Sequence, residues 1–166
     1  MPTRDTPTRK TSPRKTSPRK TPTHVALLYS VVLGPALRVV MAELKEMAAG
    51  LGLGAPQTLV ASGNLLFVAP DGSTDRTLEA GLEPAFHARF GRSIDMIVKD
   101  AAAFRAMAGA NPFMNEAEAA PTSVHVRVMR DPMPEAALEA LRPWLSPTER
   151  IALAGPDGAQ PIDEDE

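Results

Sequence analysis

Apolar positions from residue 24 onward fall first into a nearly continuous run and then into a helical stripe. The run from 24 to 32 is rich in β-branched residues and is typical of a strand buried on both faces. Glu43, Lys45 and Glu46 then lie opposite an apolar stripe that ends at the glycine-rich stretch 50–54, which predicts an amphipathic helix. The stripe consists of Met41, Leu44, Met47, Ala48 and Leu51.

The next pattern predicts a hairpin, a second helix and a further strand. Apolar runs at 57–61 and 65–69 flank a short stretch of turn-forming residues, so we expect two adjacent antiparallel strands. A helical stripe follows, in which Pro84 predicts a kink or a restart. Residues 93–99 form the next expected strand, and Asp100 can cap the helix after it. The residues of the stripe step by four: Leu78, Leu82, Phe86 and Phe90.

A strand, a helix and a short strand are expected again further along. Residues 122–129 alternate between valines and polar side chains, which predicts a half-buried strand. Pro134 suits the first turn of a helix, and a last short strand is expected at 150–153. The expected fold class is therefore α+β, with a ferredoxin-like βαββαβ unit and part of a second similar unit.

The first 23 residues have a different composition. They contain Ser/Thr-Pro-Arg-Lys units every five residues and no large apolar side chain after Met1. Without apolar side chains to bury, this segment has nothing to offset the conformational-entropy cost of folding, which is about 1–2 kcal/mol per residue. We expect a disordered basic tail at 1–23, an α+β domain at 24–154 and a flexible acidic C-terminus at 155–166.

The net charge of −2 hides a strong asymmetry between these segments. Seven basic residues against Asp5 give the tail +6, so the remaining 11 basic and 19 acidic residues give 24–166 a charge of −8. The tail is similar to the Ser-Pro-basic-basic repeats of some histone tails, which indicates salt-sensitive, sequence-indifferent contact with nucleic acid or with another acidic partner. A solvated tail without a partner, or an extension upstream of the true start, explains the composition equally. The expected phosphate contacts are Arg9, Lys10, Arg14, Lys15, Arg19 and Lys20.

Several classes of site and location are excluded by the residues. The absence of cysteine removes disulfides, Cys-containing zinc sites and thiol nucleophiles, and three scattered histidines do not indicate a metal site. No cofactor motif is present. The longest apolar stretch, 25–40, is too short and too polar to span a bilayer and does not read as a signal peptide, so we expect a cytoplasmic protein with no membrane partner.

The order of several short motifs resembles that of the DUF1697 family, small bacterial proteins whose activity is not established. The resemblance spans about residues 24 to 130. At 29–35 the sequence Tyr-Ser-Val-Val-Leu-Gly-Pro stands where the family usually has Arg-Gly-Ile-Asn-Val-Gly-Gly, and the family's glycine-rich final strand region is not found. The resemblance therefore implies a divergent and C-terminally truncated member. Its anchors are Val25-Ala26-Leu27-Leu28, Met41-Ala42-Glu43-Leu44, Ser62-Gly63-Asn64 with Phe67, Arg89-Phe90-Gly91 and Asn111-Pro112-Phe113.

The most site-like residues are the hydroxyl and amide of the hairpin turn. Ser62, Gly63 and Asn64, with Arg38 and Asn111, could bind a small anionic ligand, although residues of this kind also simply form turns. Without a catalytic motif, we expect a non-enzymatic binding or interaction domain. Two alternatives stay open: an enzyme or ligand-binding protein acting on a small anion near Ser62 and Asn64, and a nucleic-acid binder that uses its tail.

Overall fold

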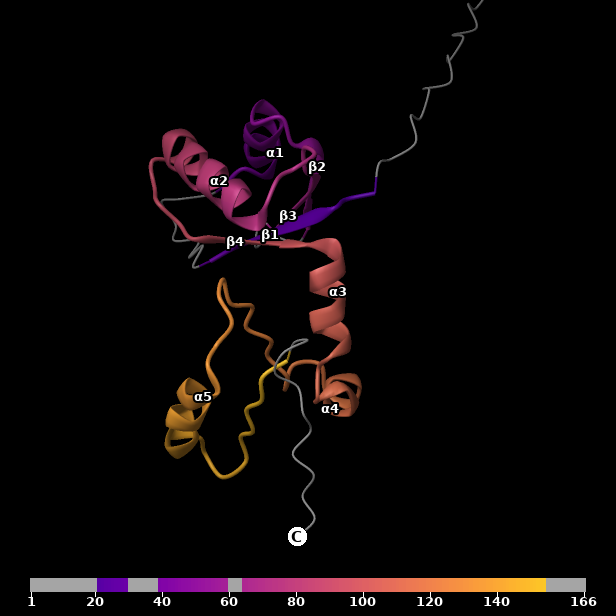
Figure 1. The fold of residues 1–166 in the computed structure, drawn as a ribbon, viewed down its shortest axis with the longest axis vertical. Coiled ribbons are helices and arrows are strands. Elements are labelled where there is room, and N and C mark those ends of the chain that lie inside the picture. The colour runs from indigo at the N-terminus through magenta and orange to yellow at the C-terminus, as the bar shows by residue number, and fades with distance from the viewer. Residues whose placement is uncertain (1–20, 30–38, 60–63, 155–166) are drawn as a thin grey trace, which may run out of the picture.

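The computed structural model describes residues 21–29, 39–59 and 64–154 (Figure 1). Its strands are β1 (His24–Leu28), β2 (Gly54–Leu59), β3 (Asn64–Val68) and β4 (Met96–Asp100). They form one antiparallel sheet in the order β2-β3-β1-β4, in which β1 pairs with β3 on one side and β4 on the other. Residues 1–20 of the expected tail, the expected C-terminus at 155–166 and the hairpin turn at 60–63 lie outside the described residues.

Two helices, α1 (Met41–Gly50) and α2 (Asp75–Phe90), cover one face of this sheet (Figure 1). With them, the first part of the chain has the predicted element order βαββαβ, and the mixed α+β class is confirmed. The narrower ferredoxin-like assignment stays a prediction. The strands differ from the expected ranges by a few residues at each end.

The core lies between the two helices and the sheet. Alternate residues of the inner strands have no exposed surface, among them Ala26, Leu65 and Phe67. Phe86 of α2 is 1% exposed, and its ring lies 4.5 Å from that of Phe90. Burying one such large apolar side chain contributes about 1.5–3 kcal/mol, so this layer supplies most of the driving force for folding.

Helix α2 runs unbroken through Pro84, so the expected restart at the proline is wrong. Thr74 and Thr77 form a reciprocal capping box at its start, and Gly91 ends it with a φ of 69°. Both ends are therefore well defined, and the buried stripe on the sheet-facing side holds the middle of the helix in place. These contributions outweigh the cost of about 3 kcal/mol for one interior proline.

Helix α3 (Ala101–Gly109) begins directly after β4, and the expected cap at Asp100 is confirmed. The Asp100 carboxylate accepts hydrogen bonds from the amides of Ala102 at 2.8 Å and Ala103 at 2.9 Å. The bond from Ala103, followed by that from Ala102, holds the pKa of Asp100 below its usual value. The Ala101 amide also donates to the Thr23 carbonyl at 2.7 Å, which ties the start of α3 to the start of β1.

Three short helices follow: α4 (Met114–Ala119), α5 (Glu135–Leu141) and the 3₁₀ helix η1 (Arg142–Trp144). The helix expected after Pro134 is confirmed, but neither 122–129 nor 150–153 forms a strand. Arg150 pairs with Glu116 of α4, and this hydrogen bond lowers the pKa of Glu116. The Arg150 guanidinium also lies 4.8 Å from the centre of the Phe113 ring.

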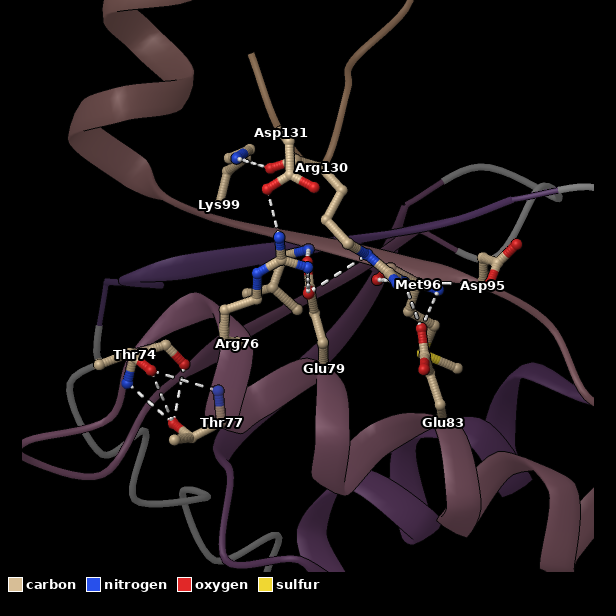
Figure 2. Close-up of polar contacts among 11 residues, drawn as sticks. Thr74, Arg76, Thr77, Glu79, Glu83, Asp95, Met96, Lys99, Arg130 and Asp131 are labelled. Atoms are coloured by element: carbon tan, nitrogen blue, oxygen red, sulfur yellow. Dashed lines mark hydrogen bonds and ion pairs between the residues drawn. The ribbon is translucent and has the colours of Figure 1, made fainter.

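Two glutamates of α2 occupy the outer edge of β4 (Figure 2). The Val98 amide donates to the Glu79 carboxylate at 3.0 Å, and the Met96 amide donates to the Glu83 carboxylate at 2.9 Å. Glu79 is the only charged residue that is buried among those the structure describes. Because β4 is an edge strand, these are the amides that an additional strand would need.

Arg130 completes this arrangement from the C-terminal part of the chain (Figure 2). Its guanidinium lies 3.3 Å from the Glu79 carboxylate and 2.5 Å from the Glu83 carboxylate, and it donates to the Met96 carbonyl at 3.2 Å. We call Glu79, Glu83 and Arg130 the edge clasp. The clasp explains why 122–129 adds no strand beside β4: side chains already occupy two amides and one carbonyl of that edge.

Contacts on either side of Arg130 extend the edge clasp. Asp131 pairs with Arg76 of α2, and this hydrogen bond raises the pKa of Arg76. Lys99 donates to the Arg130 carbonyl at 3.3 Å, and the Arg127 guanidinium lies 4.8 Å from the centre of the Tyr29 ring. The segment 127–131 is therefore attached to the sheet mainly through charged side chains.

Replacing Glu79 tests the clasp. Glu79→Ala leaves the buried Val98 amide without its acceptor and Arg130 without its most buried partner, so we expect a loss of about 3 kcal/mol in the free energy of unfolding. Urea denaturation measures this loss. Glu118→Ala, at an exposed position of α4, is the matched control and should change stability by less than about 0.5 kcal/mol. Equal losses in the two variants would contradict a structural role for the clasp.

The cap of α3 gives a pH-dependent prediction. Asp100→Ala should cost about 1 kcal/mol at neutral pH, because two amides lose their acceptor. Folding lowers the pKa of Asp100, so its stabilisation is present above the unfolded pKa of about 3.9 and is lost as pH falls through the lower folded pKa. The difference from the original protein should therefore shrink in acid. Asp100→Asn retains a capping oxygen but does not titrate, and a difference of constant size for Asp100→Ala down to low pH would refute the assignment.

Candidate functional site

Only part of the predicted ligand site falls within the described residues. Ser62, Gly63 and Arg38 lie outside them, as do all six cations predicted to contact phosphate. Asn64 opens β3, where it pairs with Leu59 and is half-buried. The Asn111 side chain accepts a hydrogen bond from the Phe113 amide at 3.0 Å, so it supports the connection between α3 and α4.

The sheet register separates the two asparagines. Asn64 lies on β3 beyond the pairing of Ala26 with Leu65, toward the end of the sheet where β1 finishes. Helix α3 leaves β4 at the opposite end, beside His24, and carries Asn111 away from the sheet (Figure 1). The structure therefore does not bring Asn64 and Asn111 together. A ligand at Asn64 would need partners from residues other than Asn111.

A groove of 660 Å³ lies between the second half of α2 and the connection to β4. It is open to solvent, and its walls combine a few apolar side chains with charged and hydroxyl groups. It begins at Tyr29, the last described residue before the segment 30–38. The lining residues are Tyr29, Ala80, Glu83, Pro84, His87, Arg92, Ser93, Ile94 and Asp95.

The polar groups of the groove form pairs within the fold. The Ser93 hydroxyl and the His87 Nδ1 atom are 3.2 Å apart, and Glu83 belongs to the edge clasp. A serine nucleophile would require a histidine that a third group orients. Throughout the described segments, no carboxylate lies within ion-pair distance of His87, so this pair lacks that third group.

The described residues hold neither a metal-ligand cluster nor a helix that could span a membrane. Residues 21–29, 39–59 and 64–154 contain no group of three or more His, Asp or Glu side chains placed to hold a metal ion. None of the helices the structure describes has the length and apolar character needed to cross a bilayer.

The most exposed large apolar side chain lies at the end of α5. Trp144 in η1 is 84% exposed and Leu141 is 40% exposed, whereas Leu138 is only 6% exposed. Ala137 and Ala140, also exposed, lie on the same side as these two residues, at spacings of three, four and seven. We call Ala137, Ala140, Leu141 and Trp144 the α5 stripe.

A charged pair lies on the side of α5 that faces away from the α5 stripe. Glu139 and Arg142 form an ion pair of 2.8 Å across one turn, and both are substantially exposed. Helix α5 lies at the periphery of the molecule, away from the sheet and from α1 and α2 (Figure 1). The stripe is therefore an exposed apolar surface, and such surfaces are typical of protein contacts.

Two features of these surfaces were not predicted from the sequence. Glu79 reads as a solvated residue in the first turns of α2, and Arg130 follows an expected strand, so nothing in the pattern joins them. Trp144 had one available signal: it is the chain's single tryptophan and continues the stripe of the predicted helix after Pro134. From the sequence alone, a tryptophan at the end of such a helix fits either packing in the core or contact with a partner.

Comparison with known proteins adds a family and one solved structure. No curated protein matches the chain. The conserved bacterial protein SP0830 from Streptococcus pneumoniae is 19% identical, with a TM-score of 0.49; the match covers 64% of this chain and 68% of that one. A sequence model described as a protein of unknown function, DUF1697, matches residues 22–157, which is most of the chain. The chain therefore belongs to the DUF1697 family.

Proposed function

We propose that this protein is a non-enzymatic binding domain that holds a protein partner against the α5 stripe. The observation that carries the proposal is the 84% exposure of Trp144. Tryptophan is enriched among the residues that contribute most to protein interfaces, because it buries a large rigid surface at a low cost in side-chain entropy. Its neighbours Leu141 and Ala140 extend the apolar surface along the same side of the helix.

Several polar groups of the groove already form hydrogen bonds within the fold, which supports binding rather than catalysis. Glu83 is bound to the Met96 amide and to Arg130, and it therefore contributes to the fold. His87 and Ser93 are paired with each other without an orienting acid in the described residues. A catalytic base needs both a positioned partner and access to a substrate. The proposal locates the protein in the cytoplasm, as expected from the sequence.

The basic tail supports a second candidate function, nonspecific contact with nucleic acid or another acidic partner. The tail carries +6 whereas residues 24–166 carry −8, so any attraction to phosphate comes from the first 23 residues. A small anionic ligand near Ser62 and Asn64 is the third candidate; of its predicted residues, Asn64 and Asn111 are within the described part of the chain.

Removing the tryptophan tests the leading proposal. Immobilised Trp144→Ala should lose proteins that the original chain captures from a cell extract, with affinities at least about tenfold weaker, because the central aromatic contact is absent. Arg92→Ala, in the groove, is the control and should capture the same proteins as the original. Capture that is identical for both variants would count against the proposal. So would turnover of a small molecule that survives Trp144→Ala and disappears when Asn64 is changed.

The tail is tested by the salt dependence of duplex DNA binding. Each phosphate contact contributes about 0.9 to the slope of log affinity against log salt, so replacing Arg14, Lys15, Arg19 and Lys20 by glutamine should reduce the slope by about 3–4. Fluorescence anisotropy with a labelled duplex gives the slope. Arg105→Gln, at an exposed position of α3, should leave it unchanged. An unaltered slope in the fourfold variant would rule the tail out as the contact.

A further inference from the structure

We infer that the groove beside α2 binds a small organic phosphate, whose phosphoryl group is held by Arg92 and His87 and whose apolar part lies along the helix. This site is separate from the α5 stripe, so it adds a second binding activity to the proposed function and does not depend on it. It also differs from the anion site expected near Ser62 and Asn64, because other residues form it.

The groove has the size of a small-ligand site. Its volume of 660 Å³ lies within the range of roughly 300–1,000 Å³ that such sites occupy. Its helical wall consists of residues at spacings of three, four and seven, which lie on one side of α2. Seven residues of helix span about 10 Å, which accommodates a phosphoryl group and one ring end to end. The residues of this wall are Ala80, Glu83, Pro84 and His87.

Arg92 is the one charged side chain of the groove that the described fold does not pair. It is exposed, and it forms no ion pair with any residue that the structure describes. The two carboxylates of the groove already face a cation, because Glu83 and Asp95 lie 2.5 Å and 4.0 Å from the Arg130 guanidinium. Arg92 is therefore the group of the groove that an anionic ligand can pair with.

His87 supplies a second donor at the same end of the groove. Ser93 directly follows Arg92 along the chain, and its hydroxyl lies 3.2 Å from the Nδ1 atom of His87. When the hydroxyl donates to Nδ1, the neutral ring carries its hydrogen on Nε2. Ser93 then orients the ring, and the Nε2 hydrogen can be donated to a ligand.

The number of donors favours a phosphoryl group over a carboxylate. The planar fork of the Arg92 guanidinium can donate to two oxygens of one anion, and the imidazole of His87 can donate to a third. A phosphate monoester has three oxygens free to accept these bonds, whereas a carboxylate has two. The chemistry of the site therefore fits a phosphate monoester.

The remaining walls of the groove suit an apolar group. Tyr29, Pro84 and Ile94 supply apolar surface. The Tyr29 amide donates to the Asp95 carbonyl at 2.8 Å, and its ring lies 4.8 Å from the Arg127 guanidinium, so its position is fixed from two sides. Because the groove is open to solvent, we expect a dissociation constant on the order of 1 mM for a ligand of about ten heavy atoms.

NMR titration of the isotope-labelled full chain with phenyl phosphate tests the site, because the amides whose signals shift show where the probe binds. We expect saturable shifts at His87, Arg92 and Ser93. Inorganic phosphate lacks the ring, and benzoate lacks the third oxygen. Each should therefore bind roughly five- to tenfold more weakly than phenyl phosphate.

Two variants test the two halves of the site. Arg92→Ala should weaken phenyl phosphate binding at least about tenfold, because two charge-assisted hydrogen bonds are lost. Its matched control is Arg105→Ala, which removes the same charge from an exposed position of α3 and should bind as the original does. Ala80→Leu narrows the groove and should weaken phenyl phosphate but not inorganic phosphate. Ala102→Leu makes the same change on α3 and should have no effect.

Saturable shifts at the groove, with losses confined to Arg92→Ala and Ala80→Leu, support the inference. Four results overturn it: no saturable shift, shifts confined to residues 1–23, equal losses in Arg92→Ala and Arg105→Ala, or equal affinity for phenyl phosphate and benzoate. The proposed function is judged separately. Trp144→Ala should still bind phenyl phosphate, and Arg92→Ala should still capture proteins, because α5 lies away from α2 (Figure 1).

Discussion

The attachment of the C-terminal third of the chain depends on one buried carboxylate. Glu79 accepts the Val98 amide and faces the Arg130 guanidinium, so it links α2, the edge of the sheet and the segment after α4. A buried charge is stable only where it is paired and hydrogen-bonded, and Glu79 meets both conditions. The position of residues 127–131, and with it the path toward α5, follows from that requirement.

The charged attachment also explains how α5 comes to be exposed. Helices α1 and α2 cover one face of the sheet, and α5 lies away from that layer (Figure 1). Segment 127–131 is held by ion pairs and a cation–π contact rather than by a core. Helix α5 buries only Leu138, and its other residues are exposed to solvent. An exposed tryptophan in such a place is better explained by a partner than by the packing of one chain.

The sequence was sufficient for elements whose pattern is local. The apolar runs at β1 and β3, the stripes of α1 and α2, and the cap at Asp100 all follow from spacing and residue type, and each is found near its expected range. The prediction of a strand at 122–129 was wrong because alternating valines and polar residues show only that one face of a segment is apolar. They do not show whether the segment has a neighbouring strand edge with which to pair. A strand needs a free edge, and Glu79 and Glu83 occupy this one through hydrogen bonds to residues that lie 19 and 13 positions further along the chain. The candidate site could be predicted less well than the fold. Asn111 forms a hydrogen bond within the connection between α3 and α4, and Ser62 and Arg38 are outside the described residues.

Both borders of the sheet are unsuited to further pairing, each for its own reason. The edge clasp occupies β4, while β2 contains Pro56, which has no amide hydrogen, and an irregular register between Gly54 and Gln57 where Ala55 has a φ of 45°. A sheet blocked on both sides resists growing by strand addition, the common route to fibrillar aggregates. The folded chain can thus reach a high concentration without offering either described edge of its sheet as a template for misassembly.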